Sequence, residues 1–261
     1  MVINLLDYFL LSQVFTFMML MCRFGTCLLA LPGFGDNYVP TRIRVLLAVV
    51  LSLMLTPMLE DSMPAIPGSP IMMLVLIGAE IFIGAFLGLL VRVLTSTMHV
   101  AGTAIANQSS LALAAIFDQN AGVQSTLIAN LFSLFGLMII FVLNLHHIMI
   151  AAMIQSYDVF PPGQWPFMAD VSNLFASKVS QAFLLGVQFA TPHIIMSLFI
   201  YMLGGVMTRL MPTFQTFFVL MPGQIMLATL LLIVLVSPMA IIYAQYLEEN
   251  LMQLVVSIGR E

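Results

Sequence analysis

Long apolar runs separated by short polar connections dominate this sequence. A helix that crosses a bilayer needs about 20 mostly apolar residues, and six runs reach or approach that length. They cover residues 8–31, 43–59, 71–98, 127–154, 179–210 and 214–247. The pattern predicts an all-α fold: a polytopic helical membrane protein with about six long hydrophobic helices or helical hairpins.

The last two runs contain residues that interrupt helices. Pro192 and the pair Gly204-Gly205 lie in the fifth run, and Pro222 and Pro238 lie in the sixth. A proline inside a helix removes a backbone hydrogen bond and clashes with the preceding turn. We therefore expect these two runs to form partly broken helices.

The stretch 101–124 differs from the apolar runs around it. It is too polar to span a bilayer, yet its middle, residues 111–117, is apolar. A short apolar stretch of this kind is typical of a re-entrant or interfacial segment. The sequence thus predicts a re-entrant polar loop after the third run.

Composition agrees with a membrane location. Of 261 residues, 62% are hydrophobic and 7% are charged, whereas a soluble domain carries about 25% charged residues. The seven Lys and Arg residues are scattered along the sequence, so we expect no basic patch that could bind nucleic acid. With no repeat and no linker, we expect residues 1–261 to form a single membrane domain in contact with lipid.

One stripe on the third run combines charges with small residues. Glu80, Gly84, Gly88 and Arg92 recur every four residues and so lie along one side of a helix. Small residues four apart let another helix approach closely. Glu80 and Arg92 are about 18 Å apart along the axis and cannot pair with each other. The stripe predicts a helix or subunit contact, with a structural ion pair for Glu80 favoured over transport chemistry.

The sequence favours neither an enzyme nor a metal site. His146 and His147 are adjacent, so on a helix they point about 100° apart and do not chelate one ion together. Cys22 and Cys27 have no further soft ligands nearby and are expected to fill apolar space. No nucleophile, phosphate-loop or dinucleotide motif occurs. We expect no catalytic residue, no metal and no cofactor.

Four sets of residues stand in a fixed order along nearly the whole chain. They are Arg23 with 32–35, Pro40, Arg42 and Arg44; Glu80, Gly84 and Gly88 with 101–102, Gln108 and Asp118; His146-His147 with Ser156 and 161–163; and Pro212, Phe217, Pro222 and Ile225. In this order they resemble the FliR/SctT family of type III secretion export-gate proteins. The stripe on the third run belongs to the second set. Ser110, Gln119 and Thr216 depart from the family pattern. The departures at Ser110 and Gln119 change the backbone geometry expected for the polar loop after the third run. The positions that the resemblance marks as structural are Arg23, Pro32, Gly33, Pro40, Arg42, His147, Pro162, Gly163, Pro212 and Pro222.

The resemblance implies a function. Such proteins are non-enzymatic subunits of the flagellar export gate in the bacterial inner membrane, within the flagellar basal body. Their implied partners are FliP-type and FliQ-type gate subunits, FlhB-type and FlhA-type export proteins, and unfolded flagellar substrates. Two alternatives stay open: a virulence injectisome subunit of the same fold, and a secondary transporter using Glu80, Arg92 or Asp118.

The resemblance also implies a pore plug in the polar loop after the third run, at about residues 108–125. An apolar constriction can close a pore by dewetting, and the apolar middle of this loop suits that role. The implied plug residues are Gln108, Leu111, Leu113, Ile116, Phe117, Asp118, Gln119 and Asn120.

Overall fold

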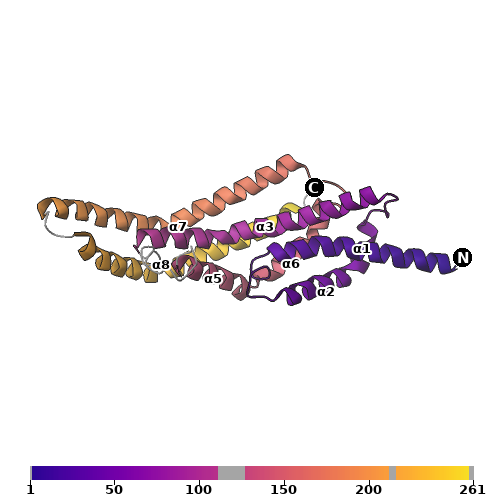
Figure 1. Cartoon of the computed structure of the whole chain (residues 1–261), viewed down its shortest axis with the longest axis horizontal. Helices are drawn as coiled ribbons and strands as arrows, with labels where there is room; N and C mark the ends of the chain where they lie inside the picture. The colour runs from indigo at the N-terminus through magenta and orange to yellow at the C-terminus, as the bar shows by residue number, and fades with distance from the viewer. Residues whose placement is uncertain (1, 111–126, 212–215, 259–261) are drawn as a thin grey trace. The chain divides into compact units, whose positions relative to one another are not determined.

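The computed structural model describes residues 2–110, 127–211 and 216–258, and within these ranges it contains helices and connections but no strand. Figure 1 shows the helices in chain order. They are α1 (Val2–Ala30), α2 (Thr41–Leu59), the 3-10 turn η1 (Glu60–Ser62), α3 (Pro70–Gln108), α5 (Leu127–Val142), α6 (Leu145–Val159), α7 (Met168–Leu210) and α8 (Thr216–Ile258). The predicted all-α fold is confirmed.

Five of these helices are long and apolar enough to cross a membrane: α1 over Leu11–Ala30, α2, α3, α7 and α8 over Leu220–Leu254. The pair α5 and α6 forms a further broken candidate span. The polytopic membrane architecture predicted from about six hydrophobic runs is therefore confirmed. The helices α3, α7 and α8 extend well beyond the length that one crossing requires.

Contacts within the chain group into two compact units. Unit 1 comprises Met1–Val93, Asn144–Lys178 and Glu248–Glu261, and unit 2 comprises Leu94–Leu143 and Val179–Leu247. The chain therefore passes between the units several times, and α3, α7 and α8 contribute to both. The single membrane domain expected from the sequence stays a prediction.

Unit 1 is built around the first three helices. Figure 1 shows α1 and α2 side by side, joined by a short connection. Phe15 and Met19 of α1 form an apolar cluster with Leu76 of α3, which Met63 and Ile66 cover from the connection before α3. The apolar faces of α1 and α3 thus meet inside this unit.

Unit 2 packs its helices on small residues. A Cβ atom at Gly102 of α3 would lie 2.8 Å from the Cα of Ala129 in α5. A Cβ atom at Gly186 of α7 would lie 2.9 Å from the side chain of Val100. Backbones this close give extensive van der Waals contact, which drives helix association in a membrane.

The helix breaks differ from those predicted. α7 runs through Pro192, and α8 runs through Pro222 and Pro238, without interruption. Each proline removes only one backbone hydrogen bond, and long helices in a membrane tolerate this loss. The fourth run is broken instead, at Asn144, whose φ of 57° is left-handed. Asparagine adopts this conformation more readily than most residues.

Helix boundaries also extend past the apolar runs. α3 continues to Gln108, so the first residues of the polar stretch are helical. α7 begins at Met168, although the apolar run begins only at Val179. The hydropathy pattern marks the part of a helix that faces apolar surroundings, whereas the backbone hydrogen bonds continue into more polar residues.

Candidate functional site

A fully buried ion pair joins α1 and α3 in unit 1. Nε of Arg23 donates to Oε2 of Glu80 at 2.5 Å, and Nη2 of Arg23 donates to Oε1 of Glu80 at 3.0 Å. The two side chains are 1% and 0% exposed. The contact is bidentate, which is the strongest geometry available between a guanidinium and a carboxylate.

The remaining donors of Arg23 bind the end of α6. Nη1 donates to the carbonyl and the hydroxyl oxygen of Ser156, both at 3.2 Å, and Nη2 donates to the carbonyl of Phe160 at 2.9 Å. The guanidinium also lies over the ring of Tyr157, 3.7 Å from its centroid. Arg23 thus makes as many hydrogen bonds as it has N–H groups and joins three helices.

This geometry has a clear energetic meaning. Burying two charges is costly, and their attraction offsets that cost only when the geometry is good and the remaining polar atoms are satisfied. Arg23 and Glu80 meet both conditions. A group held by so many fixed contacts is suited to setting the register of helices, and this favours the structural interpretation of Glu80 over transport chemistry.

The glycines of the stripe lie against α1. A Cβ atom at Gly84 would overlap Oγ1 of Thr26 and the carbonyl oxygen of Arg23. A Cβ atom at Gly88 would lie 2.6 Å from the Cβ of Ala30 and 2.7 Å from the carbonyl oxygen of Cys27. Only glycine permits this approach. The stripe is therefore a contact between α3 and α1 of the same chain.

The last member of the stripe binds the turn after α1. Nη2 of Arg92 lies 3.1 Å from Oδ1 of Asp36, and the backbone N–H of Gly33 donates to Oδ2 of Asp36 at 2.9 Å. Gly33 has a φ of 84°, which favours glycine. Arg44 of α2 donates to the carbonyl of Asp36 and, at 3.0 Å, to that of Val39. Asp36 thus links the turn to α3 and α2.

The other positions marked by the resemblance lie apart from the ion pair. Pro40 caps the start of α2, and Arg42 and His147 are exposed. Gly163 has a φ of 89° and follows Pro162 in the connection between α6 and α7. Pro222 is an exposed residue of α8 in unit 2, and Pro212 lies outside the described residues.

A second polar cluster lies in unit 2 at the end of α3. The hydroxyl of Ser197 in α7 donates to Oε1 of Gln108 at 2.6 Å. Nε2 of Gln224 in α8 donates to the backbone carbonyl of Gln108 at 2.6 Å and to the hydroxyl of Tyr201 at 3.4 Å. Ser197 and Gln224 are almost fully buried. Two helices therefore hold the last residue of α3.

Gln108 is the only implied plug residue within the described residues. Ser110, two positions later, has a left-handed φ of 61°. The positions that lie outside the described residues are Leu111, Leu113, Ile116, Phe117, Asp118, Gln119 and Asn120. The predicted re-entrant loop also falls mostly outside them.

Ser156 belongs to the motifs that carry the resemblance, but three other polar residues at these sites have no role in the sequence prediction. Asp36, Ser197 and Gln224 stand in or beside apolar runs, and their isolation there is the signal that could have marked them. Lys178 is a further example, because its ammonium group is buried near the start of α7. Within the described part of the chain, no three His, Cys, Asp or Glu residues are close enough to hold a metal ion.

The fold and these contacts define a polytopic helical membrane protein whose helices are fixed by buried polar pairs. Residues 14–250 match the family described as "Bacterial export proteins, family 1", and the chain belongs to this family. The resemblance inferred from the ordered motifs is confirmed.

Known relatives match most of this chain and most of their own length. "Flagellar biosynthetic protein FliR" of Caulobacter vibrioides is 32% identical over 239 residues, which is 92% of this chain and 95% of the relative. The proteins of the same name from Bacillus subtilis and Aquifex aeolicus are each 26% identical, covering 85% and 81% of this chain and 86% and 81% of their own lengths.

Proposed function

We propose that this chain is a non-enzymatic subunit of a flagellar type III protein-export gate in the bacterial inner membrane. It acts in the basal body with FliP-type and FliQ-type subunits, next to FlhB-type and FlhA-type export proteins. Unfolded flagellar subunits pass through the assembled pore. The match to an export family and the names of the relatives support this proposal.

The exposed apolar surface supports assembly with other subunits or lipid. In the most apolar 18-residue window of α8, 11% of the residues are buried within the chain. Ile233 and Val234 on this helix are 65% and 71% exposed. Apolar patches of this extent mark sites of protein or membrane contact.

The segment that follows α3 closes the pore in this proposal. The observation that carries this step is the double attachment of Gln108 to Ser197 and Gln224. These contacts fix Gln108, the last residue of α3, and the apolar stretch 111–117 follows it closely in the sequence. An apolar constriction excludes water and ions until it moves aside.

Deleting residues 111–120 tests the closure. The expected result is an ion leak across the membrane of cells that assemble the gate, measured as loss of membrane potential or influx of a small dye. A strain lacking the FliP-type subunit is the control, because the deleted chain then has no pore to leave open. Unchanged conductance in the assembling strain contradicts the closure.

A point variant tests the hydrogen bond from Gln224 to Gln108 separately from the deletion of residues 111–120. Gln224→Leu leaves the carbonyl of Gln108 without this donor, and we expect a smaller leak with assembly retained. Gln245→Leu is the matched control, because Gln245 is an exposed glutamine on the same helix. Equal conductance in both variants speaks against the anchoring role of Gln224.

Co-purification tests the role as a whole. We expect the chain to form a stable complex with FliP-type and FliQ-type partners, and a strain without it to lose motility. A single monodisperse chain that transports a solute would contradict the export-gate role and favour a transporter. Retained motility with lost virulence secretion would assign it to an injectisome.

A further inference from the structure

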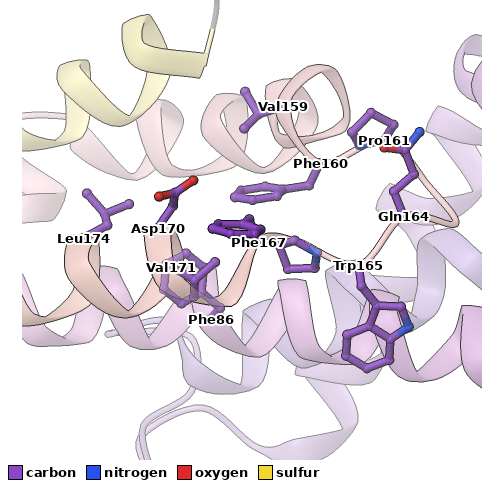
Figure 2. Close-up of a pocket in the computed structure, with 11 residues that line it drawn as sticks. Phe86, Val159, Phe160, Pro161, Gln164, Trp165, Phe167, Asp170, Val171 and Leu174 are labelled. Atoms are coloured by element: carbon purple, nitrogen blue, oxygen red, sulfur yellow. The ribbon is translucent and has the colours of Figure 1, made fainter.

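An aromatic pocket opens where the chain passes from α6 to α7, within unit 1. It has a volume of about 420 Å³. Figure 2 shows the residues that line it. They are Phe86 of α3, Val159 of α6, the connection residues Phe160, Pro161, Gln164, Trp165, Pro166 and Phe167, and Asp170, Val171 and Leu174 of α7.

The pocket combines rings with a single carboxylate. Asp170 is its only charged residue, and none of the contacts within the described chain engages the carboxylate of Asp170. Figure 2 shows this carboxylate pointing toward the ring of Phe160, with the ring of Phe167 close by. An ammonium group is attracted both by a carboxylate and by the face of an aromatic ring. The pocket therefore suits a cation.

A helix-terminal role explains Asp170 only in part. An acidic residue in the first turn interacts favourably with the helix dipole. That role requires no aromatic surroundings. Phe167 is 74% exposed and Trp165 is 50% exposed, so both rings have apolar surface that their own chain leaves uncovered. The uncovered rings point to a ligand in addition to a helix cap.

The opposite end of the pocket offers a hydrogen-bond donor. Figure 2 shows Gln164 and Trp165 at the end away from Asp170, with their side chains pointing to opposite sides. The side-chain amide of Gln164 is a donor that suits a phosphate oxygen. Val159 and Leu174 add apolar wall, and each is more than one-third exposed. A ligand with an ammonium group, a phosphate and a hydrocarbon chain matches all three features.

The position along the chain also favours a lipid. The broken span of α5 and α6 ends at Val159, and the span of α7 begins at Met168. The connection between them carries Trp165, and tryptophan is enriched at the membrane–water interface. A basic protein side chain would satisfy Asp170 but would make no use of the phosphate donor or the apolar wall.

We propose that this pocket binds an amine phospholipid such as phosphatidylethanolamine, with its ammonium group at Asp170 between Phe160 and Phe167. The phosphate lies toward the side-chain amide of Gln164, on the side away from Asp170, and the apolar lining contacts the rest of the lipid. The pocket is also coupled to the buried ion pair, because Arg23 binds the carbonyl of Phe160. The proposal does not depend on the export function.

Native mass spectrometry of the purified full chain, or of the complex in which it purifies, tests the lipid. The probes are phosphatidylethanolamine, phosphatidylglycerol and N-acetyl-phosphatidylethanolamine with identical acyl chains. We expect phosphatidylethanolamine to bind about tenfold more tightly than the other two, because they lack the ammonium group. Equal binding of the three lipids overturns the proposal, and this comparison requires no variant.

Variants then locate the site. Asp170→Asn and Phe167→Leu should remove most of the preference, whereas Asp158→Asn should keep it, because Asp158 is an exposed acid outside the pocket. Full preference in Asp170→Asn overturns the assignment. If Asp170→Asn instead releases a partner protein while the lipid preference persists, the occupant is a basic protein side chain and the lipid proposal is wrong. Conductance and motility do not enter these readouts, so the export proposal fails or holds separately.

Discussion

Arg23 and Glu80 are 57 residues apart in the chain, and their side chains form a bidentate pair between α1 and α3. The glycines that follow Glu80 on the same face of α3 bring the backbones together at the same place. The polar pair fixes the register of two helices, and the small residues allow their close contact. Each part requires the other, because a bulkier side chain at Gly84 would separate α3 from the backbone of Arg23.

Breaking this pair should destabilise the chain strongly. Arg23→Met leaves the carboxylate of Glu80 buried without its cation, and loss of one partner of a buried pair costs about 3–5 kcal/mol. The double variant Arg23→Met/Glu80→Met should recover much of the loss, because it leaves no uncompensated charge. The measurement is the temperature at which the detergent-purified chain loses its monodisperse elution peak.

Arg92→Met is the matched control for this prediction. Arg92 also pairs with an acid, but the Arg92 and Asp36 side chains are 49% and 24% exposed. Exposed ion pairs contribute about 0–1 kcal/mol. We therefore expect a small change in the unfolding temperature. If Arg23→Met is no more destabilising than Arg92→Met, the buried pair does not hold the helices.

The glycine contact makes a separate prediction. Gly84→Leu and Gly88→Leu should each push α3 away from α1, because even a Cβ atom at either position meets the opposite helix. Overpacking of a tight core costs about 1–3 kcal/mol or more. We expect reduced thermal stability, poor assembly with partners and lost motility in soft agar.

Gly25→Ala provides the control on the facing helix. A Cβ atom at Gly25 would meet nothing within 4 Å. Alanine favours a helix by about 0.5–1 kcal/mol relative to glycine, so this change should be neutral or mildly stabilising. Normal motility of the Gly84→Leu/Gly88→Leu double variant would contradict the close contact.

The sequence was sufficient to predict the class of fold and the contact face of α3. The hydrophobic runs predicted membrane helices, because each run is long enough to cross a bilayer by itself. The spacing of Glu80, Gly84 and Gly88 predicted a helix contact from periodicity alone. The partner of Glu80 was not predicted, although Arg23 stood isolated in the first run as its counterpart.

The features that were not predicted depend on tertiary contacts. Pro192, Pro222 and Pro238 suggested breaks, but the surrounding turns keep both helices continuous. The break at Asn144 in the fourth run could not be predicted from the residue type, because most asparagines in helices keep ordinary backbone angles. The bond from Gln224 to Gln108 joins residues 116 positions apart, and no local pattern signals such a pair.

A buried lysine in unit 1 offers a third prediction. Nζ of Lys178 donates to Oδ1 of Asn250 at 2.7 Å and to Oε1 of Gln253 at 3.2 Å. Lys178 and Asn250 are each 7% exposed. Asn250→Leu removes the closer acceptor from a buried ammonium group, and hydrogen bonds to charged groups contribute about 1.5–3 kcal/mol. We expect a matching fall in thermal stability of the detergent-purified chain.

Adding Lys178→Met to Asn250→Leu should restore stability. Methionine has a similar length and no charge, and replacing buried charged groups by apolar ones of similar volume is often neutral or stabilising. Glu249→Gln is the control for a change at the same end of α8, because Glu249 is exposed. If the double variant is as unstable as Asn250→Leu alone, the loss comes from packing of α8 rather than from the ammonium group of Lys178.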